Sequence, residues 1–309
     1  MRHKVYLFGY PLEHSLSPEV NNSFFESHNL PITYEALPIP PENFKHDVLG
    51  IMRSDSFLGA NVTIPYKEEI VPFLDALAGS ASKIQAVNTI VRQRNGKLIG
   101  YNTDESAVAD VLCANGKSQV ESATIIGTGG SARAIIYALA RLKCSKLRVL
   151  FRSQKRLAGI SKLLESLNIK GTFVALSQIE KFFAWAEKKD YLPTNPYNAI
   201  YSGFTEKTWE QWKAGGVSGK NDNCVKKFAL LVNATPVGMF PNTDSAVIEH
   251  PQFFKFFEVV LDLVYNPKVT KFLLASELSG CKTISGFEVF LRQAELSRKL
   301  WLKELGYEC

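Results

Sequence analysis

The residues best suited to chemistry in this 309-residue chain lie within residues 61–67. The residues before and within this stretch are largely apolar or β-branched and predict a strand, which Pro65 ends because proline has no N–H to donate to a sheet. An amide (Asn61), a hydroxyl (Thr63) and an amine (Lys67) therefore come at the end of a rigid element. Such a set suits a small hydroxylated ligand, although a lone lysine after an edge strand is ordinarily just exposed.

Two serines follow the first predicted strand, residues 5–9, in a turn that leads to a helix. Ser17-Pro18 is a typical helix start, in which the serine caps free N–H groups and the proline takes the first turn. Because Ser15 and Ser17 are two residues apart, both hydroxyls can face the same way. Beside a helix N-terminus they can hold a carboxylate. For Ser17 alone, ordinary capping is the simpler interpretation.

Further polar residues come at strand ends. Asn88 precedes a strand that a hairpin turn at residues 94–97 joins to the next strand, and Asp104 opens a helix. Either residue alone would be interpreted as a turn or cap residue. Residues 68–77 predict another helix, which Pro72 makes kinked or late. Strands alternating with helices predict an α/β layer of about a hundred residues with its polar groups at strand ends.

A second unit begins with a strand at residues 122–126 and continues with the glycine-rich turn 127–132. A helix at residues 134–142 and a strand at residues 147–151 follow. This is a βαβ unit that carries G-x-G-x-x-A, the pattern of a dinucleotide-binding turn. Its glycines let the backbone approach a pyrophosphate, and the helix N-terminus favours the negative charge.

The residues after the second strand of this unit favour NADP over NAD. An acidic residue there would hold a free ribose 2′-hydroxyl, but the chain instead has Arg152, Ser153, Lys155 and Arg156. Three cations and a hydroxyl suit a 2′-phosphate. A solvated helix start is the alternative interpretation.

Length and composition limit the class of protein. The chain is long enough for two domains, and 46% hydrophobic with 21% charged residues is typical of a soluble globular protein. Its apolar runs are too short to span a bilayer, and no signal-peptide core follows the N-terminal charges, so we expect a cytoplasmic protein. Five scattered cysteines and five dispersed histidines indicate neither a disulfide framework nor a metal site. The net charge of +6 suits an anionic ligand, without the basic block of a nucleic-acid-binding protein.

Taken together, the motifs resemble those of the shikimate/quinate 5-dehydrogenase family over nearly the whole chain. The segments that carry the resemblance are 9–18, 61–67, 86–89, 102–104, 127–132, 233–239, and Gly286 with Gln293. The resemblance implies a two-domain α/β fold. A Rossmann-type NAD(P)-binding domain would cover residues 113–283, and a discontinuous α/β substrate-binding and catalytic domain would combine residues 1–112 with 284–309.

The resemblance also implies roles for individual residues. Lys67 and Asp104 would be the catalytic pair, with the division of proton transfer between them left open. Ser15 and Ser17 would hold a substrate carboxylate. The residues that would bind hydroxyls or frame the substrate ring are Thr63, Asn88, Tyr265 and Gln293. The cofactor-binding residues would be Gly127, Thr128, Gly129, Gly130, Ser131, Arg152, Ser153, Arg156, Thr235, Leu263 and Gly286. No metal is implied.

The activity implied by the resemblance is the reversible, NADP-dependent oxidation of shikimate to 3-dehydroshikimate, a step of aromatic amino acid biosynthesis. We expect a monomer or homodimer, with a small-molecule substrate and neither nucleic acid nor membrane as a partner. One alternative is a quinate dehydrogenase that uses NAD or NADP. Another is a catalytically idle metabolite sensor, although such a relative would be expected to have lost Lys67 or Asp104.

The chain departs from the family pattern at several positions. Asn21 stands where a histidine is usual, Gln85 where a glycine is usual, and Phe151 where an asparagine is expected. Phe151 weakens the argument for strict NADP preference, so NAD remains an alternative cofactor. Residues 188–226 read as an insertion with long loops, longer than the family pattern, which is typical of a eukaryotic, fungal-type branch.

Overall fold

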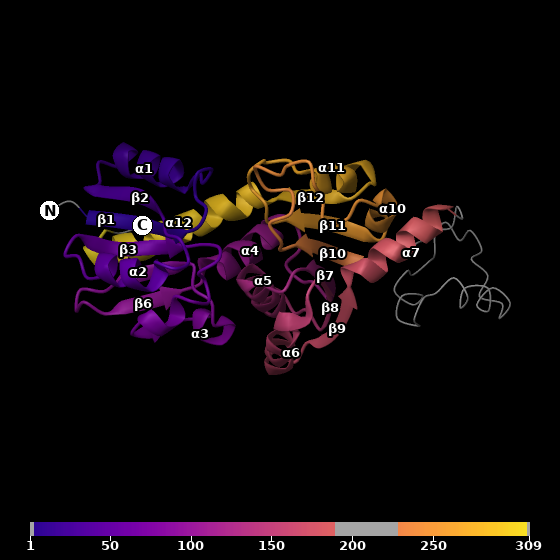
Figure 1. Ribbon diagram of the computed structural model, residues 1–309, viewed down its shortest axis with the longest axis horizontal. Coiled ribbons are helices and arrows are strands. Elements are labelled where there is room, and N and C mark those ends of the chain that lie inside the picture. Colours follow the sequence, from indigo (N-terminus) through magenta and orange to yellow (C-terminus); the bar gives the residue numbers. More distant parts are fainter. Residues whose placement is uncertain (1–2, 189–227, 308–309) are drawn as a thin grey trace. The chain divides into compact units, whose positions relative to one another are not determined.

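The computed structural model describes residues 3–188 and 228–307 (Figure 1). The chain divides into two compact units. The first unit comprises Met1–Ser118, Arg133–Ala138 and Glu288–Cys309, and the second comprises Gln119–Ala132 and Leu139–Phe287. The domain limits expected from the sequence stay a prediction. Apart from Lys188, the expected insertion at residues 188–226 lies outside the described residues, and so does the branch inferred from it.

The first unit contains a mixed six-stranded sheet with the order β2-β1-β3-β5-β6-β4. Strand β1 pairs in parallel with β2 and β3, while β5 is antiparallel to both β3 and β6. The strands are β1 His3–Gly9, β2 Ile32–Pro38, β3 Phe57–Val62, β4 Ala76–Leu77, β5 Thr89–Arg92 and β6 Leu98–Tyr101. The helices are α1 Ser17–Ser27, α2 Phe44–Met52, α3 Ala81–Ile84, α4 Thr103–Ala114 and α12 Gly286–Leu305.

Alternate residues of β1 enter two different cores. Tyr6 and Phe8 pack with residues of α2, such as Val48, in one hydrophobic cluster. Val5 and Leu7 point to the opposite face, where their cluster includes Phe25 of α1 and Trp301 of α12. Because successive side chains of a strand point to opposite faces and both faces of the sheet are covered, residues 5–8 of β1 are all apolar or aromatic and buried.

Two expectations about local structure in this unit are wrong. Residues 68–77 form turns, a short 3₁₀ helix Val71–Phe73 and strand β4, not a helix. Pro72 cannot donate to a longer helix, and Asp75 N–H donates instead to the Leu98 carbonyl beside β6. Ser17 does not cap α1 either: it is the first helical residue, and the N-cap is Leu16, which makes no side-chain capping bond.

The second unit contains a six-stranded sheet with the order β12-β11-β10-β7-β8-β9, in which every pairing is parallel. This order is that of the Rossmann fold, in which the first strand of the unit, β7, lies at the centre. The strands are β7 Ser122–Ile126, β8 Lys146–Phe151, β9 Lys170–Ala175, β10 Phe228–Asn233, β11 Phe257–Asp262 and β12 Lys282–Ser285. The helices include α5 Gly130–Arg141, α6 Leu157–Ser166, α7 Leu176–Lys188, α10 Pro251–Phe254 and α11 Lys271–Leu278.

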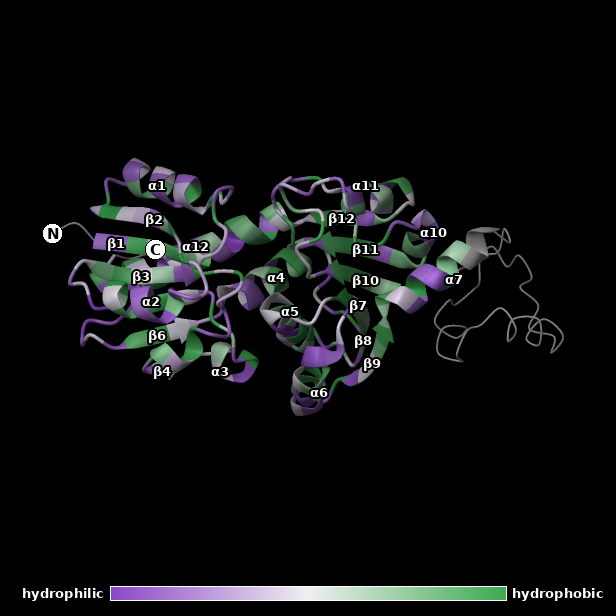
Figure 2. Cartoon of the chain, in the orientation of Figure 1, coloured by the Kyte–Doolittle hydropathy of each residue, from purple (hydrophilic) through white to green (hydrophobic). Residues whose placement is uncertain are grey.

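Strands β7, β10 and β11 are largely apolar, as Figure 2 shows, and the sheet packs against a phenylalanine-rich core. The predicted βαβ unit is therefore present, with β7, α5 and β8 in the expected places. Together with the mixed sheet of the first unit, this confirms the predicted fold class of a Rossmann-type unit and a second α/β unit. Every helix within residues 3–188 and 228–307 is too short or too polar to cross a membrane.

Gly59 of β3 lets α12 approach the sheet. A Cβ atom at this position would lie 2.3 Å from the Ile90 carbonyl oxygen and 2.4 Å from Trp301 Nε1, two atoms that are hydrogen bonded to each other. We predict that Gly59→Ala lowers the free energy of unfolding by about 1–3 kcal/mol, because either β5 or the indole must move.

Gly50→Ala is the matched control for this prediction, because a Cβ at Gly50 in helix α2 meets no atom within 4 Å. This change should raise the free energy of unfolding by roughly 0.5–1 kcal/mol, since alanine favours a helix interior. Urea denaturation followed by circular dichroism measures both. Equal stabilities of wild type and Gly59→Ala would contradict the inferred close packing.

Candidate functional site

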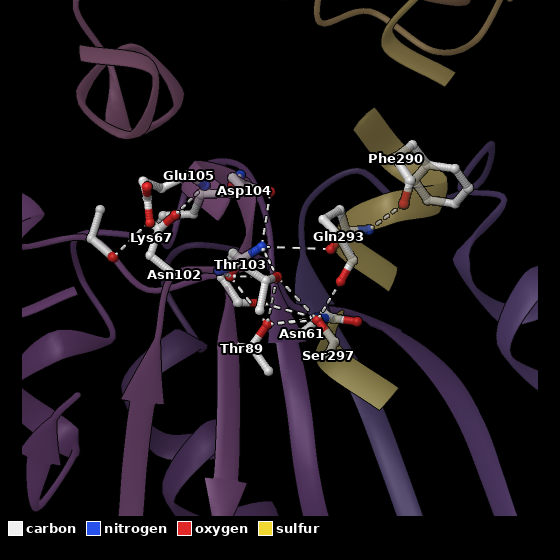
Figure 3. A network of polar contacts seen from close by, with 12 residues as sticks. Asn61, Lys67, Thr89, Asn102, Thr103, Asp104, Glu105, Phe290, Gln293 and Ser297 are labelled. Atoms are coloured by element: carbon white, nitrogen blue, oxygen red, sulfur yellow. Dashed lines mark hydrogen bonds and ion pairs between the residues drawn. The ribbon is translucent and has the colours of Figure 1, made fainter. Parts of the chain in front are cut away.

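The first unit places Lys67 and Asp104 in direct contact. Lys67 Nζ lies 2.6 Å from Asp104 Oδ2, and the two side chains are only 14% and 18% exposed. The residues come from the turn after β3 and from the first turn of α4, as Figure 3 shows. An amine and a carboxylate that are shielded from water and hydrogen bonded to each other can exchange protons with a ligand hydroxyl.

Lys67 is positioned by its neighbour Tyr66. The ring of Tyr66 is fully buried, stacks on Phe44 with a centroid distance of 3.8 Å, and its hydroxyl donates to the carbonyl of Ile39. The backbone carbonyl of Lys67 also accepts from Val87 N–H at 2.7 Å. A buried aromatic residue and a backbone bond on either side of Lys67 therefore hold a segment that has no regular helix.

Asp104 is positioned by the start of α4. Asn102 is the N-cap of this helix: its side-chain oxygen accepts from Glu105 N–H at 3.1 Å, and its amide donates to the Ala86 carbonyl at 2.9 Å. The N-terminus of a helix stabilises a nearby negative charge. The carboxylate of Asp104 therefore lies where the helix favours it.

Asn88 joins the pair to the sheet. Its Nδ2 donates to Asp104 Oδ1 at 2.8 Å and to Thr103 Oγ1 at 2.9 Å, while its Oδ1 accepts from Thr103 N–H at 2.7 Å. A longer contact of 3.5 Å reaches Gln293 Oε1. The structure thus brings together four predicted site residues, Lys67, Asp104, Asn88 and Gln293. The Asn88 amide mainly orients Asp104, whereas its predicted contact with the substrate stays a prediction.

Beneath this group lies a buried polar network that the sequence did not indicate (Figure 3). Ser297 of α12 is fully buried, and its hydroxyl lies 2.8 Å from Thr89 Oγ1, 3.1 Å from Thr103 Oγ1 and 3.1 Å from Asn61 Nδ2. The side-chain oxygen of Asn61, Oδ1, accepts from the Tyr34 hydroxyl at 2.8 Å. Asn61 therefore supports the site from below. The only sequence signal for Ser297 is its position four residues, about one helical turn, after Gln293.

The predicted carboxylate-binding serines lie at the same edge of this sheet. Ser15 and Ser17 follow the carboxyl end of β1, Thr63 follows that of β3, and these two strands are parallel neighbours. Ser15 Oγ accepts from Ser17 N–H at 3.3 Å. A Cβ at Gly9 would lie 2.4 Å from the Thr63 methyl group, so Thr63 packs against the start of the serine loop. Carboxyl ends of adjacent strands thus present hydroxyls beside the turn that carries Lys67.

The predicted cofactor residues lie at the carboxyl edge of the other sheet, where the order of the strands reverses. Gly127 ends β7 with a φ of +117°, a conformation that favours glycine, and a Cβ there would lie 3.2 Å from the Ala234 carbonyl. Thr128, Gly130 and Ser131 are half-buried at the start of α5. Gly286 has no room for a side chain, because a Cβ would lie 2.5 Å from the Leu263 carbonyl carbon. The switch point of an open parallel sheet is where dinucleotides bind.

The positively charged segment after β8 also fits a phosphorylated dinucleotide. Arg152, Ser153 and Arg156 are exposed, and Ser153 caps the following turn by accepting from Lys155 N–H. Arg156 Nη1 lies 3.3 Å from the position that a Cβ of Gly129 would occupy, so its guanidinium lies over the glycine-rich turn. A cation at this turn suits an NADP phosphate group.

Asp262 is a buried carboxyl that supports this cofactor edge, and the sequence analysis did not single it out. It is 0% exposed and accepts from Thr270 Oγ1 at 2.6 Å, from Asn233 Nδ2 at 2.9 Å and from Val264 N–H at 3.1 Å. Asn233 Oδ1 in turn accepts from the backbone N–H and the hydroxyl of Thr235. Asp262 therefore fixes the turns after β10 and β11. The available signal was an acid at the end of an apolar strand.

Within the described residues, no three His, Cys, Asp or Glu side chains are grouped so that they could hold a metal ion. Tyr265, the remaining predicted substrate residue, belongs to the second unit, unlike the Lys67–Asp104 pair. Its contact with the substrate therefore stays a prediction.

Comparison with known proteins agrees with this geometry. Residues 7–90 match the family model described as the shikimate dehydrogenase substrate binding domain. The curated shikimate dehydrogenase (NADP(+)) of Desulforamulus reducens is 33% identical over 299 residues, which cover 96% of this chain and 88% of the relative. The chain belongs to the shikimate dehydrogenase family. The resemblance inferred from the motifs is thereby confirmed.

Solved members of the family share the fold. A shikimate dehydrogenase in complex with NADP+ matches with a TM-score of 0.74 at 30% identity, over 97% of this chain and 90% of that one. The shikimate 5-dehydrogenase of Thermus thermophilus, solved with NADP(H) and shikimate, matches with a TM-score of 0.70 at 27% identity. That match covers 97% of this chain and 94% of the Thermus chain.

The buried position of Asp262 predicts a pH-dependent stability. Burial raises the pKa of this carboxyl from 3.8 to about 6, against the lowering effect of its three hydrogen-bond donors. Between these two pH values the folded chain keeps a proton that the unfolded chain releases. The stability that this proton provides is present at low pH and is lost as the pH rises to about 6.

Asp262→Asn removes this titration. The free energy of unfolding of wild type minus that of Asp262→Asn should therefore rise by about 1 kcal/mol as the pH falls from 7 to 5. Urea denaturation of both proteins at several pH values gives this difference, in which the other carboxyls cancel. A difference that is constant over this range would contradict the raised pKa of Asp262.

Proposed function

We propose that this member of the family catalyses the reversible oxidation of shikimate to 3-dehydroshikimate with NADP. The observation that carries the proposal is the shielded Lys67–Asp104 contact of 2.6 Å at the ligand-binding edge of the first unit. Both residues belong to motifs that resemble those of the family, and a catalytically idle relative would not need to keep them. Bound NADP+ would supply the acceptor for the hydride that leaves the alcohol carbon.

The pair performs the proton transfer that alcohol oxidation requires. The substrate hydroxyl loses its proton as its carbon becomes a carbonyl, and a group within hydrogen-bond reach must take that proton. Lys67 Nζ and Asp104 Oδ2 share one contact, so a proton accepted by either can be passed to the other. Asn88 holds the second oxygen of Asp104 at 2.8 Å and thereby keeps the carboxylate oriented toward the amine.

The remaining residues select and orient the substrate. Ser15 and Ser17 would donate to the carboxylate, and Thr63, Asn88, Gln293 and Tyr265 would bind hydroxyls or frame the ring. The half-buried positions of Ser15, Thr63 and Gln293 support these roles, because each side chain stays partly accessible, Ser15 and Thr63 in turns after strands and Gln293 on a helix. The proposed enzyme acts in the cytoplasm as a monomer or homodimer, and the thiols of Cys113 and Cys144, which form no disulfide, suit a reducing compartment.

Initial rates on shikimate and on quinate, each with NADP and with NAD, test the proposal. We predict turnover of shikimate with NADP, and a fall in kcat of about 100- to 10,000-fold in both Lys67→Met and Asp104→Asn. Lys271→Met is the matched control, because it removes an exposed lysine that pairs with Asp244. Its rate should equal that of wild type.

The other outcomes of this assay are equally informative. Preference for quinate would replace the proposed substrate. Binding of shikimate without turnover in any of the four pairings would overturn the enzymatic function and leave a metabolite sensor. Full activity of Lys67→Met would remove the pair from the mechanism.

The cofactor preference is tested separately. We predict that the double variant Arg152→Gln/Arg156→Gln raises KM for NADP by about 10-fold or more and changes KM for NAD by less than about two-fold, because only NADP carries the 2′-phosphate. Lys146→Gln, at the other end of β8 in an exposed pair with Glu121, is the control. Equal effects on both cofactors would show that these arginines do not recognise the 2′-phosphate.

A further inference from the structure

Arg298 of α12 is a half-buried cation that has no carboxylate partner among the described residues. Its Nη1 donates to Asn21 Oδ1 at 3.2 Å, and its Cζ lies 4.4 Å from the centroid of the Phe24 ring. Its Nε atom is buried and has no hydrogen-bond partner. The acid closest along the helix, Glu295, has its two oxygens bound by Arg292 and Lys299.

An arginine in this state lowers the stability of the folded protein. Desolvation lowers the pKa of Arg298, which shows that its surroundings disfavour the positive charge. The side chain nevertheless stays protonated, because guanidinium is too basic to lose its proton in a protein. The charge of Glu295 offsets this effect only in part, and a half-buried charge that no carboxylate contacts directly destabilises the fold unless a partner is supplied. A negatively charged ligand nearby would be such a partner.

The hydrogen bonds of Arg298 lead to the predicted carboxylate site. Asn21, which accepts from Arg298, donates through its own Nδ2 to the backbone carbonyl of Ser17 at 2.9 Å. Ser17 is the first residue of α1, and Asn21 follows it by one helical turn on the same buried face. Ser17 and Ser15 contact each other, so the guanidinium lies next to the part of α1 that carries the serine pair.

The two serines alone provide no net charge for a carboxylate. Their hydroxyls can donate hydrogen bonds, and the N-terminus of α1 adds a partial positive charge. The full positive charge of Arg298, which contacts Asn21 one helical turn after Ser17 and is shielded from water on the side of Phe24, adds a favourable interaction that a neutral ligand cannot gain.

We propose that Arg298 is a positioning residue that supplies the positive charge of the carboxylate site, acting through Asn21 and through its field at Ser15 and Ser17. This inference rests on the proposed function, which assigns the serine pair to the substrate carboxylate. It makes the enzyme select substrates by their charge, so that a ring acid is preferred to its uncharged ester.

The test compares shikimate with shikimate methyl ester in the full-length enzyme at saturating NADP. Arg298→Met keeps the apolar stem and removes the charge. We expect it to raise KM for shikimate by about 5- to 30-fold, with kcat within about two-fold, and to leave KM for the ester within about two-fold. Arg298→Lys keeps the charge and should retain most of the preference for the acid.

Lys299→Met is the matched control. It lies beside Arg298 on the same helix and changes the net charge equally, but it removes a half-exposed lysine that is paired with Glu295. Its KM for shikimate should equal that of wild type. Added salt should reduce the difference between wild type and Arg298→Met on the acid, because ions screen the interaction.

Two results would overturn the inference. An equal rise of KM for acid and ester in Arg298→Met would indicate a purely structural role through Asn21, and no change for either would remove Arg298 from the site. The wild-type rate on shikimate tests the proposed function by itself. Calorimetric titration of acid and ester measures the same charge preference without turnover, so the two proposals can fail separately.

Discussion

The hydrogen bonds of the Asn88 side-chain amide are the interactions on which the rest of the first unit depends. It is buried, so its donors and acceptor must be hydrogen bonded inside the protein. It meets this requirement by joining Asp104 and Thr103 at the start of α4, which places the carboxylate of the reactive pair. Any ligand that Asp104 binds therefore encounters a carboxylate that the sheet itself has oriented.

The requirement that buried polar groups be hydrogen bonded also applies to the residues beneath Asn88. Thr89, Thr103, Asn61 and Ser297 satisfy one another beneath Asn88, and Ser297 belongs to a helix at the far end of the sequence. Buried polar groups that are fully bonded specify one arrangement, because a shifted helix would leave several of them without partners. The network thus fixes the register of α12 against the sheet. It thereby places Gln293 near Asn88 and Arg298 beside Asn21.

In the second unit, the buried carboxyl of Asp262 joins neighbouring segments as the Asn88 amide does in the first. Asp262 joins the ends of β10 and β11 and the start of α11, and it holds Thr235 through Asn233. In both units, then, a buried polar side chain at a carboxyl edge orders the loops that are proposed to contact ligands. The exposed arginines after β8 need no such support, because their proposed phosphate-binding role requires reach more than rigidity.

Much of this architecture could be predicted from the chain alone. The apolar runs of the strands, the glycine-rich turn between β7 and α5, and the polar residues after apolar strands are local patterns. They indicated the Rossmann-type unit and the edge of the first sheet that carries the polar side chains. Local patterns failed where another part of the chain competes with them. Residues 68–77 have an acidic start and apolar spacing suited to a helix, but pairing of β4 with β6 and the burial of Tyr66 decide otherwise.

The sequence by itself determined which residues could do chemistry here, because amine, carboxylate, hydroxyl and glycine types are visible without coordinates. Only the tertiary structure decided which of them act together. Lys67 and Asp104 are 37 residues apart and meet at 2.6 Å, while Ser297 lies 208 residues from the threonine that it contacts. Asp262, Ser297 and Arg298 could not be recognised beforehand. Their importance arises from burial and from partners distant in the chain, and neither leaves a periodic signal in the sequence.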